Sequence, residues 1–154
     1  MGKISRDLPL SEIVLRRYEK PQLNVGEREL VKKLCLSVGL LQPGDSRDVV
    51  VDLLYVMLKN RKREMSCTEV EKRVIASRKR HRQPMIGIAG SNIRRQLKRL
   101  RELFLVEKVK NKYRLAEFSK PGEIFEQKVE KFLLENTLSR VKEYFAKVDE
   151  TFFR

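Results

Sequence analysis

The chain has 154 residues, a length that suits one domain core with or without an added helix. Its hydrophobic share of 41% is enough for a folded core, and its net charge of +14, with a pI near 10.0, points to a polyanionic partner. The longest apolar run, Val49–Leu58, is too short to cross a bilayer, and no amino-terminal stretch has the pattern of a signal peptide. We therefore expect a cytoplasmic protein that makes no use of a membrane.

The surplus of positive charge is confined to the central third of the chain. Between Lys59 and Arg114 there are 19 Lys and Arg residues and 5 acidic residues, whereas the remaining segments carry equal numbers of bases and acids. A generally basic composition would spread the charge more evenly. The distribution therefore favours a localised anion-binding surface over a solvated face.

The amino-terminal residues predict a helical extension over 1–44. Met1–Pro9 carry little pattern, and Ser11–Glu19 predict a short helix that Pro21 ends. Gly26–Leu41 has apolar residues at helical spacing, and Gln42–Asp45 predicts a turn.

The next segment, to about Asn60, is apolar on almost every side and predicts a helix at the centre of the core. Asp45 or Ser46 is the expected cap at its start. The run Val49–Val51 leaves open the alternative that this segment begins as a buried strand.

A capped helix is predicted from Ser66 to about Arg82, because Ser66 and Glu69 have the spacing of a capping box. It ends in a basic run that suits the carboxyl end of a helix dipole. The run exceeds that need, so we expect its Arg and Lys residues to meet an anion as well: Arg78, Lys79, Arg80 and Arg82.

Residues 91–104 predict an amphipathic helix. Its buried stripe is expected to comprise Ile93, Leu97, Leu100 and Phe104. Val106–Leu115 then predicts two short strands around a polar turn, with basic residues facing outward. A docked helix followed by a basic two-stranded ribbon is the arrangement of a recognition helix and its wing.

The tail after Pro121 predicts amphipathic helix to the end of the chain. Apolar residues follow steps of four and three: Leu134, Leu138, Val141, Phe145, Val148 and Phe152. Upstream, Phe125, Val129 and Phe132 follow the same steps in a register offset by two, which predicts either a break or a change of buried face. The seam has two alternative uses, which are to cover its own domain or to pair with a second copy. We expect a homodimer, which would place two recognition helices about 34–36 Å apart on a palindromic site.

Residues 46–117 resemble a winged helix-turn-helix module, on the phrase SNIRRQLKRLRELFLVEKVKNKYRL and the helices before it. The phrases LSEIVLRRYEKP and CLSVGLLQPGDSRDVVVDLLYVMLKN are similar to those of a family of archaeal predicted transcriptional regulators. The resemblance implies a mainly α fold with a small β-wing, in which residues 45–118 form the winged helix and 119–154 a long carboxyl-terminal helix. It also implies binding of double-stranded DNA, with residues 91–104 in the major groove and the wing, residues 106–115, on the backbone or in the minor groove.

The side-chain chemistry independently favours duplex DNA. Arg can bridge two acceptors on guanine, and Asn or Gln can do the same on adenine. The candidates for base contacts are Asn92, Arg95, Gln96 and Arg99. The candidates for phosphate contacts are Ser91, Arg94, Lys98, Arg101, Lys108, Lys110, Lys112 and Arg114. For Arg94 and Arg101, a structural salt bridge is the competing interpretation.

The remaining residues predict no enzyme, cofactor or metal site. The one histidine, His81, lies among cations and is expected to be a surface residue or a neighbour of phosphate rather than a catalytic base. Cys35 and Cys67 lack pairing or metal-ligand spacing and predict reduced packing residues. We therefore expect a nucleoid-associated transcriptional regulator, and the alternative is a winged helix that docks proteins in a transcription or chromatin assembly without reading DNA sequence.

Overall fold

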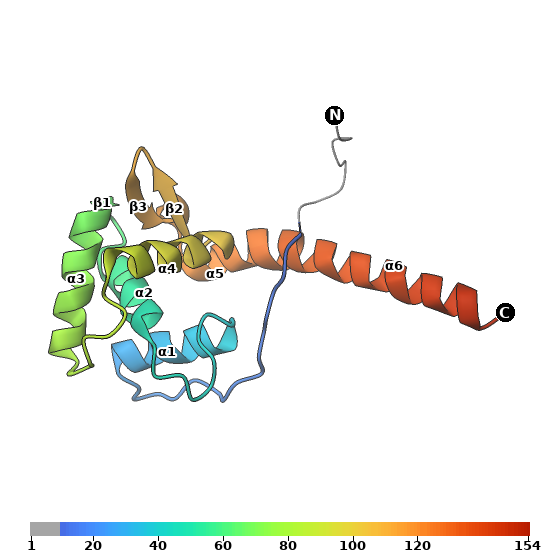
Figure 1. The fold of residues 1–154 in the computed structure, drawn as a ribbon, viewed down its shortest axis with the longest axis horizontal. Coiled ribbons are helices and arrows are strands. Elements are labelled where there is room, and N and C mark those ends of the chain that lie inside the picture. The colour runs from blue at the N-terminus through green and yellow to red at the C-terminus, as the bar shows by residue number, and fades with distance from the viewer. Residues whose placement is uncertain (1–9) are drawn as a thin grey trace.

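The computed structural model describes residues 10–154, so the expectation for Met1–Pro9 lies outside the described residues. The described chain is mainly helical, with a small antiparallel sheet and a long carboxyl-terminal helix (Figure 1). Within this part of the chain, none of the helices combines the length and apolar character needed to span a membrane. In order, the elements are α1 (Glu27–Ser37), α2 (Val49–Lys59), β1 (Met65–Ser66), α3 (Cys67–Arg80), α4 (Gly90–Glu102), β2 (Val106–Val109), β3 (Lys112–Leu115), η1 (Ala116–Phe118), α5 (Pro121–Ile124), η2 (Phe125–Leu134) and α6 (Glu135–Phe152).

Helix α2 lies at the centre of the core, as its apolar composition predicts. Every residue from Val49 to Met57 is buried, and α1, α3 and α4 all pack against it. The alternative of a buried strand at Val49–Val51 is therefore wrong. The predicted caps are wrong too, because the helix starts later, after Asp48. Asp45 instead accepts a hydrogen bond from the backbone N–H of Arg47 at 2.9 Å.

The predicted helix at Ser11–Glu19 does not form, and these residues run without regular secondary structure. Arg16 explains the difference, because it ties this segment to the end of α1. Its backbone N–H donates to the Ser37 carbonyl at 2.8 Å, and its guanidinium donates to the carbonyls of Leu36 at 2.7 Å and Leu41 at 3.0 Å. The last carbonyls of a helix lack partners within the helix, and α1 has no basic residue in its last turn. Arg16 supplies hydrogen-bond donors there, and these contacts hold its own segment in an irregular conformation.

The sheet has the strand order β1-β3-β2, and all its pairs are antiparallel. The two strands predicted within residues 106–115 are confirmed as β2 and β3, joined by Lys110 and Asn111. Both joining residues have positive φ, 50° and 64°, as a tight two-residue hairpin requires. One half of the capping box predicted for α3 is present, since the Ser66 hydroxyl accepts from the Glu69 backbone N–H at 3.2 Å. The Glu69 carboxylate instead accepts from the Arg63 guanidinium at 3.0 Å.

The carboxyl-terminal segments α5, η2 and α6 follow one another without a break in helical backbone angles at Phe125 and Glu135 (Figure 1). The middle segment, η2, is a π-helix, whose hydrogen bonds span one residue more than those of an α-helix. Its buried residues Val129 and Leu133 follow the buried Ile124 at steps of five and four, which is a wider period than the heptad. This wider turn accounts for the register offset in the sequence. It also makes the prediction for Phe132 wrong, because that side chain is 50% exposed.

Candidate nucleic-acid interface

Helix α4 has two chemically opposite faces. Ile93, Leu97 and Leu100 are fully buried in the hydrophobic core around α2, as their spacing predicts. The expectation for Phe104 is wrong in detail, because α4 ends at Glu102 and Phe104 adopts a positive φ of 63° beyond it. The exposed face of the helix consists of Ser91, Arg94, Arg95, Lys98 and Arg101, with Glu102 at its end. The apolar face therefore fixes a cationic face toward solvent.

Three of the predicted base-contacting residues form a half-buried polar row along one edge of α4. Asn92 donates to the Gly87 carbonyl at 2.8 Å, and Gln96 donates to the side-chain oxygen of Asn92 at 3.3 Å. Arg99 then donates to the side-chain oxygen of Gln96 at 2.8 Å and to the Gly39 carbonyl at 3.3 Å. These donors are engaged by the protein itself. The row therefore links α4 to the loop between α1 and α2 and to the loop between α3 and α4.

Arg95, the fourth predicted base contact, is exposed and lies against this row. Its guanidinium donates to the side-chain oxygen of Asn92 at 2.8 Å. Asn92 thus holds one edge of the Arg95 guanidinium in place. A restrained Arg loses less conformational entropy when it binds a planar, bidentate partner.

A polar pocket of about 380 Å³ adjoins the same edge of α4. The loop between α1 and α2 contributes Gln42, Asp45 and Arg47 to its lining, opposite Arg95 and Arg99. Arg47 is exposed and adds a cation beside the candidate residues of α4. Sequence reasoning missed Arg47, because the only signal is its position in a polar turn and the folded chain alone brings that turn to α4.

The hairpin presents its lysines as predicted but not its arginine. Lys108, Lys110 and Lys112 are exposed. Arg114 instead donates to the Glu107 carboxylate at 2.6 Å, and its guanidinium lies 4.7 Å from the centre of the Phe118 ring. Arg114 therefore stabilises the base of the hairpin, and the structure does not support its predicted role as a phosphate contact.

The contacts at the base of the hairpin lower the pKa of Glu107. Burial alone would raise the pKa of Glu107, but hydrogen bonds from the Glu117 backbone N–H and from Arg114 outweigh burial, so that the pKa lies below its ordinary value. The carboxylate consequently stays charged and keeps Arg114 occupied.

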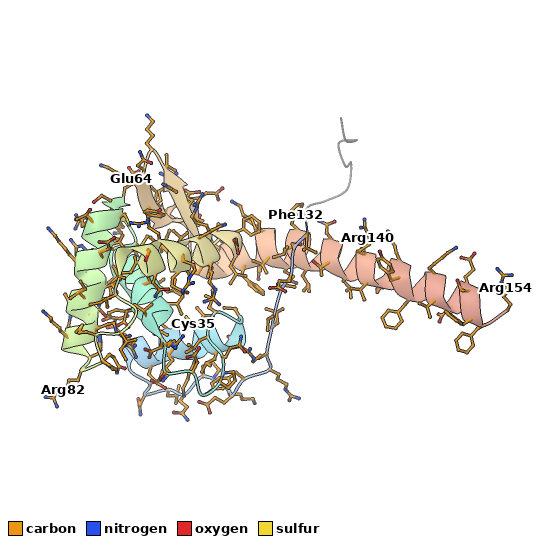
Figure 2. All side chains as sticks on the ribbon, in the orientation of Figure 1. Cys35, Glu64, Arg82, Phe132, Arg140 and Arg154 are labelled. Atoms are coloured by element: carbon orange, nitrogen blue, oxygen red, sulfur yellow. The ribbon has the colours of Figure 1, made fainter. Side chains whose placement is uncertain are left out.

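The basic end of α3 divides into one buried and three exposed cations. Arg78 has only 1% of its surface exposed. Its guanidinium donates to Asp48 at 2.9 Å, to Asp52 at 2.8 Å and to the Pro84 carbonyl at 2.8 Å. The prediction that Arg78 contacts DNA is therefore wrong as the structure places it. Lys79, Arg80 and Arg82 are exposed, and Figure 2 shows Arg82 projecting from the end of α3.

The two aspartates that bind Arg78 also bind Arg28 of α1. Arg28 donates to Asp52 at 2.9 Å and to Asp48 at 3.0 Å. Burial acts to lower the pKa of Arg28, but its hydrogen bonds to Asp52 and Asp48 outweigh this and raise it. Burial acts to raise the pKa of Asp48, and hydrogen bonds from Arg78 and Arg28 outweigh this and lower it. The four-residue cluster ties α1, α2 and α3 together at the point where the last loop before α4 begins.

The competing interpretation of Arg94, a structural salt bridge, receives only weak support. Its guanidinium lies 3.9 Å from the Glu71 carboxylate, and 59% of the Arg94 side chain is exposed. Exposed pairs at this distance contribute at most about 1 kcal/mol. Arg94 therefore stays among the candidate DNA contacts.

The remaining candidates for chemistry lie inside the fold or at its edge. Cys35 is buried, and burial raises the pKa of its thiol to about 12. His81 packs edge-on against Tyr55, with ring centres 5.2 Å apart. Among residues 10–154, no group of three His, Cys, Asp or Glu side chains is arranged to hold a metal ion.

Comparisons of the chain with protein-family models, with curated proteins and with solved structures find no match. The resemblance to winged helix-turn-helix regulators therefore stays a prediction.

Proposed function

We propose that this protein is a sequence-specific regulator of transcription that binds double-stranded DNA through a winged helix. The proposed module comprises α2, β1, α3, α4, β2 and β3, with α4 in the major groove and the hairpin along the backbone. The support is topological and electrostatic. The proposal is supported by three helices followed by a hairpin, with the hairpin pairing to β1 in an antiparallel sheet of order β1-β3-β2.

One observation carries the proposal, which is the contrast between the two faces of α4. Ile93, Leu97 and Leu100 are fully buried, so the orientation of the helix is fixed. Arg94, Arg95 and Lys98 therefore lie on its exposed side. A helix that docks by one face and exposes cations on the other fits a major groove, which admits an α-helix and is flanked by phosphates.

Within this face, we assign base readout first to Arg95. Its guanidinium is exposed yet held by Asn92, and a guanidinium placed in this way can donate two hydrogen bonds to the O6 and N7 atoms of guanine. Asn92, Gln96 and Arg99 then act mainly by holding Arg95 and the neighbouring loops in position. The exposed cations on either side of Arg95 are assigned to phosphates: Arg94, Lys98 and Arg101.

The hairpin is assigned to the DNA backbone. Lys110 lies in the tight turn at its tip, and Lys108 and Lys112 lie in the strands beside the turn. Flexible ammonium groups make good phosphate contacts but distinguish bases poorly. The hairpin therefore contributes affinity for any sequence.

The test is selection of preferred sites from a pool of random duplexes, followed by binding measurements on the full chain and on variants. Arg95→Ala is expected to lose about 1–3 kcal/mol on the preferred site and to relax the preference at one base pair. Lys110→Ala is expected to weaken binding about equally on every sequence. Arg17→Ala removes the same charge from an exposed residue of the amino-terminal segment and serves as the matched control.

Two results would overturn parts of the proposal. Equal losses for Arg95→Ala on all sequences would refute its assignment as a base-reading residue. Failure of the intact protein to bind duplex DNA would refute the proposed function and favour the alternative, a winged helix that docks another protein.

A further inference from the structure

The apolar seam of α6 is exposed along its whole length. The exposed fractions are 49% for Leu138, 46% for Val141, 67% for Phe145, 47% for Val148 and 75% for Phe152. None of the residues of α6 is buried against the described chain. Figures 1 and 2 show why, since beyond Phe132 the helix projects away from the other elements. The alternative that the tail covers its own domain thus applies to α5 and η2 and not to α6.

The seam has the geometry of a helix that packs against another helix. Steps of four and three keep its apolar residues on one side when two helices coil around each other. From Leu134 to Phe152 the seam extends for roughly 27 Å at about 1.5 Å per residue. A partner must therefore offer a seam of the same repeat and a similar length, and a second copy of α6 offers both.

We propose that two copies of this protein associate through α6, in a parallel two-helix coil. The positions next to the seam decide the orientation. Parallel pairing places Thr137 beside Lys142 of the second copy and Tyr144 beside its Asp149, so no like charges meet and the Tyr144 hydroxyl can donate to a carboxylate. Antiparallel pairing of all six seam residues places Lys142 beside Lys142 and Glu135 beside Asp149, so like charges meet at both of these pairs.

The area of the seam meets the lower requirement for a stable interface. If each exposed seam residue removes roughly 100 Å² from water, two arms together bury about 1,000 Å². Tyr144, 70% exposed beside the seam, adds to this area. The opposite face of α6 is polar and carries two ion pairs within the helix, Arg140–Glu143 and Lys147–Glu150. The apolar seam is therefore the face of α6 that is suited to pack against a second helix.

The first experiment measures the mass of the full chain in solution by light scattering, without DNA. The wild type is expected to have twice the monomer mass of 18.2 kDa. Val141→Asp with Phe145→Asp is expected to restore the monomer mass, because the carboxylates would face each other across the seam. Ser139→Asp with Ala146→Asp adds the same charge outside the seam and is expected to stay dimeric. A monomeric wild type, or a dimer that survives the seam variant, would overturn the proposal.

The second experiment tests the orientation by oxidation of Val148→Cys in a Cys67→Ser background. Parallel pairing brings the two Val148 positions together at a spacing that a disulfide can bridge, whereas the antiparallel arrangement places Val148 beside Leu138. Rapid cross-linking of the dimer is expected, and a dimer that does not cross-link would refute the parallel orientation. Neither experiment involves DNA, so the pairing of α6 and the proposed function can fail separately.

Discussion

Replacing Arg78 by Ala tests whether this cation holds the fold together or meets DNA. The side chain is 1% exposed and donates to two buried carboxylates, of Asp48 and Asp52. Two hydrogen bonds to charged groups contribute about 3–6 kcal/mol at roughly 1.5–3 kcal/mol each. Breaking a buried ion pair costs about 3–5 kcal/mol. Without Arg78, the two carboxylates keep Arg28 as the cation of the cluster, and one cation then faces two buried negative charges. We therefore expect Arg78→Ala to lower the free energy of unfolding by about 3–5 kcal/mol.

The assay is urea unfolding of the full chain, with thermal unfolding as a second measurement. For a chain of this size, the expected loss lowers the melting midpoint by about 10–15 °C. Arg80→Ala, two residues further along α3 and exposed, is the matched control and is expected to change stability by less than about 0.5 kcal/mol. Equal stability of the two variants would refute the role assigned to the buried cluster.

Two further predictions concern the same fold. The pKa of Asp48 is lowered in the folded chain, so its contribution to stability is fully present above its ordinary pKa of 3.8 and is lost as the pH falls through the lower pKa of the folded chain. The melting temperature should therefore decrease when the pH is brought below about 4, and an unchanged melting temperature at pH 3 would contradict this. Arg16→Ala leaves the carbonyls of Leu36 and Leu41 without the donors that Arg16 supplies. The free energy of unfolding, measured in urea, should fall by about 1–3 kcal/mol. A urea midpoint equal to that of the wild type would show that Arg16 does not anchor the amino-terminal segment.

The elements that the sequence predicts well are those whose patterns are local. The buried stripe of α4 depends on the spacing of Ile93, Leu97 and Leu100 within one helix, and the structure buries all three. The hairpin depends on alternating residues around Lys110 and Asn111, and strands β2 and β3 form there. In both cases the helix or strand period alone decides which side chains face inward.

The errors arise where distant residues decide the outcome. Arg78 belongs to a basic run whose composition predicts exposure to solvent. It is buried because it donates hydrogen bonds to Asp48 and Asp52, which lie 26 or more residues earlier in the chain. In the same way, the apolar periodicity of Ser11–Glu19 is overridden by the hydrogen bonds of Arg16 at the end of α1. No local pattern encodes such long-range partners.

The candidate interface shows both behaviours. Exposure of Arg95 and Lys98 follows from the helix period and is predictable from sequence. The engagement of Asn92 with Gly87, and of Arg99 with Gly39, depends on two loops that only the folded chain brings to α4. Sequence therefore identifies the helix, and the structure identifies which of its polar residues are exposed and which are engaged within the fold.

The central claim is that the exposed cations of α4 and the hairpin bind duplex DNA. Its most direct test is to measure the affinity of the full chain for a duplex at a series of salt concentrations. If about six cations neutralise phosphates, the logarithm of the binding constant should fall with the logarithm of salt concentration at a slope near −5. Lys110→Ala with Lys112→Ala should reduce the magnitude of that slope by about two. An affinity that does not change with salt, or a slope that the double variant leaves unaltered, would contradict the claim.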